Sequence, residues 1–269
     1  MNLLTCILTQ NDCCKAKRTI TPKGVMVHST GANNPNLKRY VQPAAGDADY
    51  AALLARLGAN ANGNHWNQSG IAKCVHGFIG KLADGSVAAV QTLPWNSRGW
   101  HAGTGTSGKS ANDTHISFEI CEDGLTDKTY FSRVYQAAVE LTARLCKEYG
   151  LDPLADGVVI CHSEGYRRGV ASGHADVEHW FPKFGKTMDD FRADVSAALA
   201  PEPKPEPEPE KEDGMTYYKT LDEIPEYYRT TMEKLVETGA LKGTGGNELN
   251  VSEDFCRVMT LLDRLGKLD

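Results

Sequence analysis

The sequence predicts a layered α/β domain followed by a small helical module. Over the first 200 residues, short β-branched or apolar runs alternate with segments of helical periodicity, which is the pattern of strands packed against helices. A stretch rich in proline and glutamate, 201–214, then separates this region from residues 215–269. Because about 200 residues can bury a complete core, we expect one domain over 1–200 and a separate module over 215–269.

Five runs predict the strands of the first domain. Each run is short, apolar or β-branched, and bounded by polar or turn-forming residues. The predicted strands are 25–28, 74–80, 86–92, 115–121 and 157–161. They are mixed with helices along the chain, so they indicate a sheet that helices cover.

Three segments of the same domain predict helices. A helix over 48–57 is closed by Gly58, and a longer helix ends at Gly150. A third helix begins at Thr187, whose hydroxyl can cap it while Asp190 completes a capping box. The apolar face of the longer helix is formed by Val134, Ala137, Ala138, Leu141 and Leu145.

The C-terminal part of the chain has a different composition. The segment 201–214, PEPKPEPEPEKEDG, alternates proline with charge and predicts an extended, semi-rigid spacer. In the module that follows, Pro225 suits the first turn of a helix that Gly239 would end, and Ser252 can cap a second helix. Two helices over about 55 residues bury little apolar surface, so we expect this module to be marginally stable alone or to associate with copies of itself.

Charge excludes several classes of partner. Residues 201–269 hold 16 acidic and 9 basic side chains, whereas residues 1–200 hold 19 and 20 and are nearly neutral. The sequence therefore lacks the basic surface that nucleic acid or an anionic membrane requires, and we expect neither as a partner. No apolar run approaches the roughly 18 residues of a transmembrane helix.

The N-terminal segment and the cysteines predict a protein of the cytoplasm. The longest N-terminal apolar run, Leu3 to Leu8, lacks a basic flank and a small-residue cleavage site, so we expect no Sec signal peptide. The eight cysteines stand at irregular spacings. That pattern predicts reduced thiols rather than a disulfide framework.

The histidines predict a metal site. All eight lie between His28 and His179. His28 ends the run VMVHST, His162 follows the run VVIC, and His174 and Asp176 come soon after in GHADVEHW. Strand ends lie at the rim of a sheet, where a catalytic zinc needs three protein ligands and one open position. For any one histidine alone, a half-buried and hydrogen-bonded side chain is the ordinary interpretation.

Glu119 adds a carboxylate to this group. It lies in HISFEIC, where Phe118 and Ile120 point to the opposite face of the predicted strand. A carboxylate inside an apolar strand is costly unless it is exposed, paired or functional. Glu119 is therefore a candidate for acid–base chemistry beside the histidines.

Together, five separated motifs give the chain a family resemblance. They are VMVHST, WHAG at 100–103, Asn112 ahead of HISFEIC, CHSEGYRRG and HADVEHWFP. Their order over roughly residues 1–199 resembles the zinc-dependent N-acetylmuramoyl-L-alanine amidases of the phage-lysozyme and peptidoglycan-recognition type. The resemblance implies a mixed central β-sheet flanked by helices, with one Zn²⁺ at its rim. With its linker and C-terminal module, the plan also resembles phage or prophage endolysins, which implies that the protein stays in the cytoplasm until lysis and then acts on a Gram-positive cell wall.

The resemblance also implies the metal ligands. His28 and His162 match the first two ligands, and Asp176 matches the third. The sequence departs from the usual pattern in the longer stretch before Asp176 and in His174, which stands where the family usually has lysine. His174 therefore either binds zinc itself or replaces the lysine that stabilises the oxyanion, while His179 is either structural or substrate-facing.

The mechanism that the resemblance implies is hydrolysis of the amide between N-acetylmuramic acid and the first L-alanine of the stem peptide. Glu119 matches the catalytic glutamate, which would take a proton from a zinc-activated water and pass it to the leaving amine. A cationic His174 would stabilise the oxyanion. The substrate groove is expected to include His76, Trp100, His101 and Asn112.

Alternatives remain open from the sequence. Cys161 with His162, or Cys74 with His76, would suggest a Cys–His peptidoglycan peptidase, although neighbours on a strand point to opposite faces. A muropeptide-recognition module without catalysis is another candidate, but such a protein would not need Asp176. The C-terminal module weakly resembles S-layer-homology-like and other wall-associated modules, and it would anchor the protein to the wall, make it oligomerise, or act as a spacing appendage.

Overall fold

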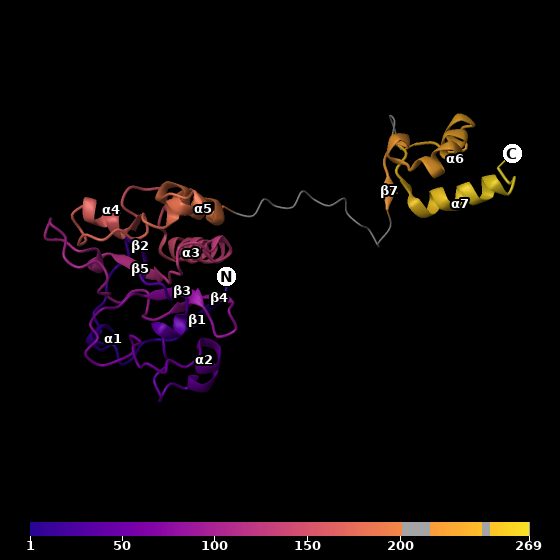
Figure 1. The fold of residues 1–269 in the computed structure, drawn as a ribbon. Helices are drawn as coiled ribbons and strands as arrows, with labels where there is room; N and C mark the ends of the chain where they lie inside the picture. Colours follow the sequence, from indigo (N-terminus) through magenta and orange to yellow (C-terminus); the bar gives the residue numbers. More distant parts are fainter. Residues whose placement is uncertain (201–215, 244–247, 269) are drawn as a thin grey trace. The chain divides into compact units, whose positions relative to one another are not determined.

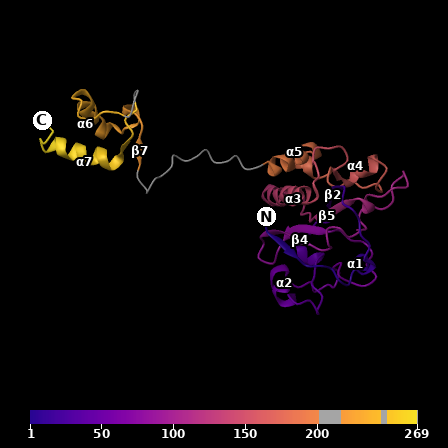
Figure 2. The same cartoon turned by 180° about the vertical axis from the view of Figure 1, so that it is seen from behind.

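A computed structural model describes residues 1–200, 216–243 and 248–268. The chain divides into two compact units, Met1–Pro201 and Glu202–Asp269, which Figure 1 shows from one side and Figure 2 from behind. The predicted Pro/Glu spacer, 201–214, lies outside the described residues.

The first unit is built on a mixed six-stranded sheet with the strand order β1-β4-β3-β5-β2-β6. Strands β3 and β4 run antiparallel, whereas the other neighbouring pairs run parallel. The strands are β1 (Leu3–Thr5), β2 (Gly24–Ser29), β3 (Gly77–Lys81), β4 (Val87–Gln91), β5 (His115–Ile120) and β6 (Val159–Cys161). The mixed central sheet is confirmed, and β1 is an edge strand that the sequence pattern did not predict.

Helices cover both faces of this sheet. Helices α3 (Lys128–Tyr149) and α5 (Met188–Leu199) lie on one face, and α2 (Tyr50–Leu57) lies on the other (Figure 1). Their predicted ends are confirmed: Gly58 and Gly150 are the C-caps of α2 and α3, and Thr187 forms a capping box with Asp190 at the start of α5. Shorter elements are α1 (Asp12–Ala16), α4 (His162–Arg167) and the 3-10 turns Leu37–Arg39, Ala111–Asp113 and Phe181–Phe184.

Alternate residues of the strands pack into separate apolar clusters on the two faces of the sheet. Val27, Phe118 and Ile120 pack with α3 and α5. Met26 and Ile160 point the other way and form a smaller cluster. Because side chains alternate along a strand, His28 and Glu119 share the face of Met26, and the parallel register places these two residues opposite each other on β2 and β5.

The second unit contains a two-stranded ribbon as well as two helices. The elements are β7 (Tyr217–Tyr218), a 3-10 turn (Leu221–Glu223), α6 (Glu226–Glu237), β8 (Val251–Ser252) and α7 (Glu253–Arg264). Both predicted helices are confirmed, and the side chain of Ser252 caps α7 by accepting the N–H of Phe255. Pro225 is the N-cap residue of α6 rather than part of its first turn. Within the described residues, no helix of either unit is long and apolar enough to cross a bilayer.

The cysteines correct one expectation. Cys13 and Cys74 form a disulfide across 61 residues of sequence, so the prediction that all eight cysteines are reduced thiols is wrong. The bond joins α1 to the segment before β3, where the N–H of Asp12 also donates to the carbonyl of Ile71. Spacing could not predict this pair because the fold alone brings the two segments together. Six other cysteines are free in the described parts of the chain.

Candidate active site

Three side chains converge at the C-terminal edge of β2, β5 and β6. The Nδ1 atom of His28 lies 3.1 Å from Nδ1 of His162 and 3.1 Å from Oδ2 of Asp176, and the distance from His162 Nδ1 to Asp176 Oδ2 is 3.7 Å. Donor atoms about 2.1 Å from a tetrahedral Zn²⁺ stand about 3.4 Å apart. The spacing of these three donors therefore fits zinc with one position left open.

The chemistry of the three donors also fits a cation. Two imidazole nitrogens and a carboxylate oxygen are ligand types that zinc accepts in catalytic sites. His28 and His162 are 1% and 4% exposed, and burial is the main reason why the pKa of His162 is lowered to about 4. His162 is therefore neutral near pH 7, with a lone pair available for a metal.

Local structure explains how these donors meet. His28 is the fifth residue of β2, and His162 is the first residue of α4, directly after β6. Since β6 pairs with β2 in parallel, both side chains emerge at the same edge. Asp176 comes from the irregular segment after α4, and the N–H of Ser163 donates to its carbonyl.

The second ring nitrogen of His28 contacts His101. The distance from His28 Nε2 to His101 Nδ1 is 3.0 Å. If Nδ1 of His28 held a metal, Nε2 would carry the ring proton and would donate a hydrogen bond to Nδ1 of His101. Burial lowers the pKa of His101 well below its ordinary value, so His101 is a neutral acceptor. The side chain of Asn112 fixes this residue, because its Oδ1 accepts the backbone N–H of His101 at 2.7 Å.

Asp176 lies on a segment that we call the strap, residues 175–179. Within it, Nε2 of His179 lies 2.9 Å from Oε1 of Glu122, and the same oxygen accepts the N–H of Gly31 at 3.1 Å. Glu122 follows β5, whereas Gly31 follows the strand that carries His28. His179 thus ties the strap to the side of the first ligand, which gives it a structural position.

The strap is also tied to the helix of the second ligand. Glu178 accepts two hydrogen bonds from the guanidinium of Arg167 in α4, at 2.6 and 2.9 Å, and one from the hydroxyl of Ser163. Consecutive side chains, Glu178 and His179, therefore connect Asp176 to the elements that hold the other two ligands.

Glu119 lies beside the three donors and is unusual in its bonding. Its Oε2 atom is buried and has no hydrogen-bond partner within the described residues. Burial raises the pKa of Glu119 to about 7; the Asp176 carboxylate adds to this effect and His28 opposes it. An unpartnered carboxylate with a pKa near neutrality is suited to accept and return a proton.

His174 lies next to the cluster without completing it. In the described chain, the group whose ligand atoms all lie within 4.8 Å of one another consists of His28, His162 and Asp176. The ring of His174 packs at 4.4 Å against the ring of His162, and its Nδ1 lies 3.3 Å from Oγ of Ser172. The side chain is exposed, so the geometry favours Asp176 as the third member of the donor group and places His174 on its solvent-exposed side.

Comparison with known families decides the identity. Residues 18–182 match the family described as N-acetylmuramoyl-L-alanine amidase. The chain belongs to the N-acetylmuramoyl-L-alanine amidase family. The match includes every residue of the cluster and the strap, from His28 to His179, and it ends before α5.

Solved structures similar to the amidase include bacterial and endolysin enzymes. The hydrolase AmiA of Staphylococcus aureus, in complex with its ligand, is 19% identical over 66% of this chain and 73% of its own, with a TM-score of 0.43. The catalytic domain of XlyA is 21% identical over 72% and 99%, with a TM-score of 0.45. LysC of Clostridium intestinale is 16% identical over 70% and 99%, with a TM-score of 0.38. Similarity at these identities and TM-scores gives no information about the roles of individual residues. No curated protein sequence matches the chain.

Two residues predicted to line the substrate groove of the amidase are buried instead. His76 is fully buried, with Nε2 2.7 Å from the carbonyl oxygen of Ser97 and Nδ1 accepting the N–H of Ser117 at 3.0 Å. Asn112 is also fully buried. Both side chains are hydrogen-bonded inside the fold. Trp100 is 45% exposed and remains a candidate for substrate contact.

The competing thiol mechanism does not fit the amidase structure. Cys161 is fully buried, and burial raises the pKa of its thiol, which disfavours the thiolate that a nucleophile needs. Cys74 is bonded to Cys13. Neither cysteine can serve as a nucleophile in this structure.

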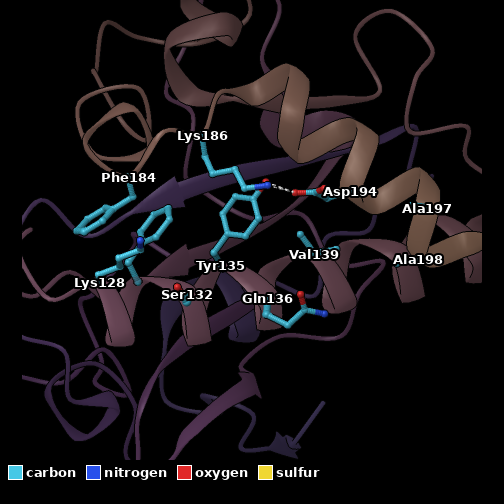
Figure 3. Close-up of a pocket in the computed structure, with 11 residues that line it drawn as sticks. Lys128, Ser132, Tyr135, Gln136, Val139, Phe184, Lys186, Asp194, Ala197 and Ala198 are labelled. Atoms are coloured by element: carbon cyan, nitrogen blue, oxygen red, sulfur yellow. Dashed lines mark hydrogen bonds and ion pairs between the residues drawn. The ribbon is translucent and has the colours of Figure 1, made fainter.

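A separate pocket of 510 Å³ lies between α3 and α5 (Figure 3). There Lys186 lies over the ring of Tyr135 at 5.0 Å, and its Nζ is 2.7 Å from Oδ2 of Asp194. The charged groups of Lys186 and Asp194 are therefore paired, in contrast to Glu119. The pocket is on the α3 side of the sheet, behind the face that carries the metal donors.

Proposed function

We propose that the amidase hydrolyses the bond between N-acetylmuramic acid and L-alanine with a Zn²⁺ held by His28, His162 and Asp176. The observation that carries this proposal is the position of Glu119: its unpartnered carboxylate stands opposite His28 in the register of β2 and β5. A three-donor cluster next to a carboxylate of near-neutral pKa is the arrangement that metal-assisted amide hydrolysis requires.

The residues around the donors then have distinct roles. A Zn²⁺ held by these three donors would supply Lewis acidity to the attacking water and to the scissile carbonyl. Glu119 takes a proton from the water at its free Oε2 and returns it to the nitrogen of the leaving L-alanine. His174, on the solvent-exposed side of the donor group, stabilises the negative charge that develops on the carbonyl oxygen of the substrate. His101 orients His28, and Asn112 orients His101.

A muropeptide-binding protein without catalysis is the alternative within this fold. Such a protein has no use for a carboxylate whose burial costs free energy and gains no hydrogen bond. The buried carboxylate of Glu119, which lacks a hydrogen-bond partner among the described residues, therefore supports an enzyme rather than a binding module.

We further propose that the amidase acts as an endolysin on the peptidoglycan of a Gram-positive host. The support is the plan of the chain, a catalytic unit followed by a Pro/Glu-rich segment and a second compact unit. That second unit would hold the enzyme on the wall or join copies of it. Cell fractionation before and after lysis should find the protein in the cytoplasm until lysis; a protein on the wall of intact cells would contradict this role.

Mass spectrometry of purified peptidoglycan after digestion tests the reaction itself. We expect free stem peptides that begin with L-alanine, together with intact glycan chains, and we expect a chelator to stop their release. New reducing sugars would indicate a glycosidase and cut cross-bridges a peptidase, and either product without free L-alanine ends would overturn the proposal.

A further inference from the structure

Helix α7 of the second unit is apolar on two opposite faces. Its inner face carries Cys256 and Met259, which pack in the small core with Met232 of α6. On the other side, Val258, Leu261 and Leu265 are 50%, 59% and 61% exposed. These three residues recur at helical spacing and form one stripe, which we call the outer stripe.

The outer stripe resembles a contact surface more than a set of isolated exposed side chains. Single exposed apolar residues are common, but a contiguous apolar stripe marks an interaction site. Burial of a large aliphatic side chain that is otherwise exposed to water is favourable. A unit whose own core is small thus leaves a substantial driving force for association on the surface of one helix.

The charges of α7 indicate what covers the stripe. Asp254 lies one turn before Val258 in the acidic first turn, where it is 3.7 Å from Arg257 of its own helix; Arg264 ends the helix, and Lys267 lies in the turn that follows. In an antiparallel pair of α7 helices, Val258 meets Leu265 of the second copy, and the acidic first turn with Asp254 lies beside the basic C-terminal end of that copy. A parallel pair would instead place Asp254 against Asp254 and Arg264 against Arg264, which is unfavourable.

We propose that the outer stripe is the contact surface of a homodimer in which two α7 helices pack antiparallel about a two-fold axis beside Leu261. The stripe is self-complementary, as the interface of a two-fold dimer must be. This inference concerns the second unit and does not rest on the catalytic chemistry of the first.

The size of the surface sets the strength of the dimer. Helix α7 has 12 residues and is about 18 Å long, so the contact buries less than the roughly 1,200 Å² of a standard stable interface. The dimer is therefore weak in solution and becomes populated at high local concentration. Two catalytic units joined in this way would bind a polymeric wall with higher avidity than one.

Sedimentation velocity of the full chain over two decades of concentration tests the dimer. We expect a reversible monomer–dimer equilibrium that Leu261→Asp weakens at least tenfold. Tyr227→Asp is the matched control, because Tyr227 is 62% exposed on α6, outside the stripe; this variant should dimerise like the unmodified chain. Circular dichroism shows whether each variant is folded. A chain that stays monomeric throughout, or a folded Leu261→Asp variant that dimerises unchanged, would overturn the proposal.

Cross-linking tests the antiparallel orientation. In a Cys14→Ser background, which removes a half-exposed thiol, Leu261→Cys should form a disulfide with its own copy under mild oxidation. Asp254→Cys should not cross-link to itself but should cross-link to Lys267→Cys in a mixture. Self-cross-linking of Asp254→Cys would show a parallel pair. If the stripe instead binds the wall or the first unit, none of the single or mixed variants will cross-link between chains, and the homodimer is refuted.

Discussion

The two faces of the central sheet are made by alternate residues of the same strands, yet at the C-terminal ends of β2 and β5 they differ in chemistry. Towards α3, Val27, Phe118 and Ile120 form a closed apolar core. On the opposite face, His28 and Glu119 stand side by side, and Glu119 keeps a buried oxygen without a partner. The rigid core on one face holds the polar groups of the other face in fixed positions. The buried oxygen of Glu119 can therefore stay without a hydrogen-bond partner and remain available for proton transfer.

The pocket in Figure 3 offers a second comparison, because it has a substantial volume but its charged side chains are already paired with each other. Its lysine, Lys186, is paired with Asp194 and stacked over Tyr135. The metal donors, in contrast, converge on one another at distances that fit a shared cation. In this molecule, unsatisfied donors and acceptors indicate the reactive site better than cavity volume does.

Replacing Glu119 should have the largest effect. Glu119→Gln keeps the shape of the side chain but removes the proton acceptor, so amide hydrolysis should fall by about 10²–10⁴-fold. Zinc content should remain stoichiometric, because Glu119 is not among the three donors. The release of L-alanine ends and metal analysis measure the two quantities. An active Glu119→Gln variant would show that this face of the sheet does not supply the proton acceptor.

Replacing Asp176 should have the next largest effect, on metal binding. Asp176→Ala removes one of three donors and should lose stoichiometric zinc in competition with a chelator, whereas His174→Ala should retain zinc and lose activity by about 10²–10³-fold. These two variants are a matched pair because the residues lie two positions apart. Zinc retained by Asp176→Ala and lost by His174→Ala would reverse the assignment of the third ligand.

The sequence was sufficient to predict the three side chains that converge, because each one lies at a strand end or in a distinct motif. The face of Glu119 also followed from alternation with Phe118 and Ile120. Contacts across the fold could not be predicted in this way. His101 was expected at the substrate, yet its Nδ1 atom lies 3.0 Å from Nε2 of His28, 73 residues away.

His76 shows a second limit of sequence reasoning. It precedes β3 and looks like the other strand-end histidines, but both of its nitrogens are bonded inside the protein. Nothing in its own motif distinguishes an inward-facing histidine from an exposed one. The Cys13–Cys74 disulfide is similar, since it depends on how α1 packs.

Loosening the strap should have a smaller effect on the metal. Glu122→Gln weakens the bond to His179 and should reduce zinc affinity by about tenfold, because residues that orient a ligand typically contribute 10- to 100-fold. Glu178→Gln is the comparison: it loosens the other attachment of the strap, but zinc affinity should fall less, since its pair with Arg167 is largely exposed, at 39% and 55%, and such pairs contribute little. Chelator competition measures both affinities. Equal losses for the two variants would contradict the role of the Glu122–His179 contact.

Buried His76 should make stability depend on pH. Burial lowers its pKa to about 4 in the folded protein, whereas the unfolded chain titrates near 6.5. Between these values the unfolded chain binds a proton that the folded protein does not, so the free energy of unfolding falls as the pH falls. From pH 7 to pH 5 this contribution is about 2 kcal/mol. His76→Gln should show a correspondingly weaker decline in denaturant titrations, and an unchanged decline would show that His76 is not the source.

Changing the pocket behind α3 should have the smallest effect. Lys186→Met removes the pair with Asp194, whose side chains are 35% and 39% exposed, and should cost less than about 1 kcal/mol of stability. Asp194 still accepts the hydroxyl of Tyr135 at 2.6 Å, so α5 stays attached to α3. Because the metal donors lie on the other face of the sheet, zinc content should not change and hydrolysis should stay within about twofold, well below the tenfold that 1.4 kcal/mol represents. A tenfold loss of hydrolysis with normal stability would mean that the pocket takes part in the reaction. In that case the α3 face of the sheet would contribute to the chemistry as well as to packing.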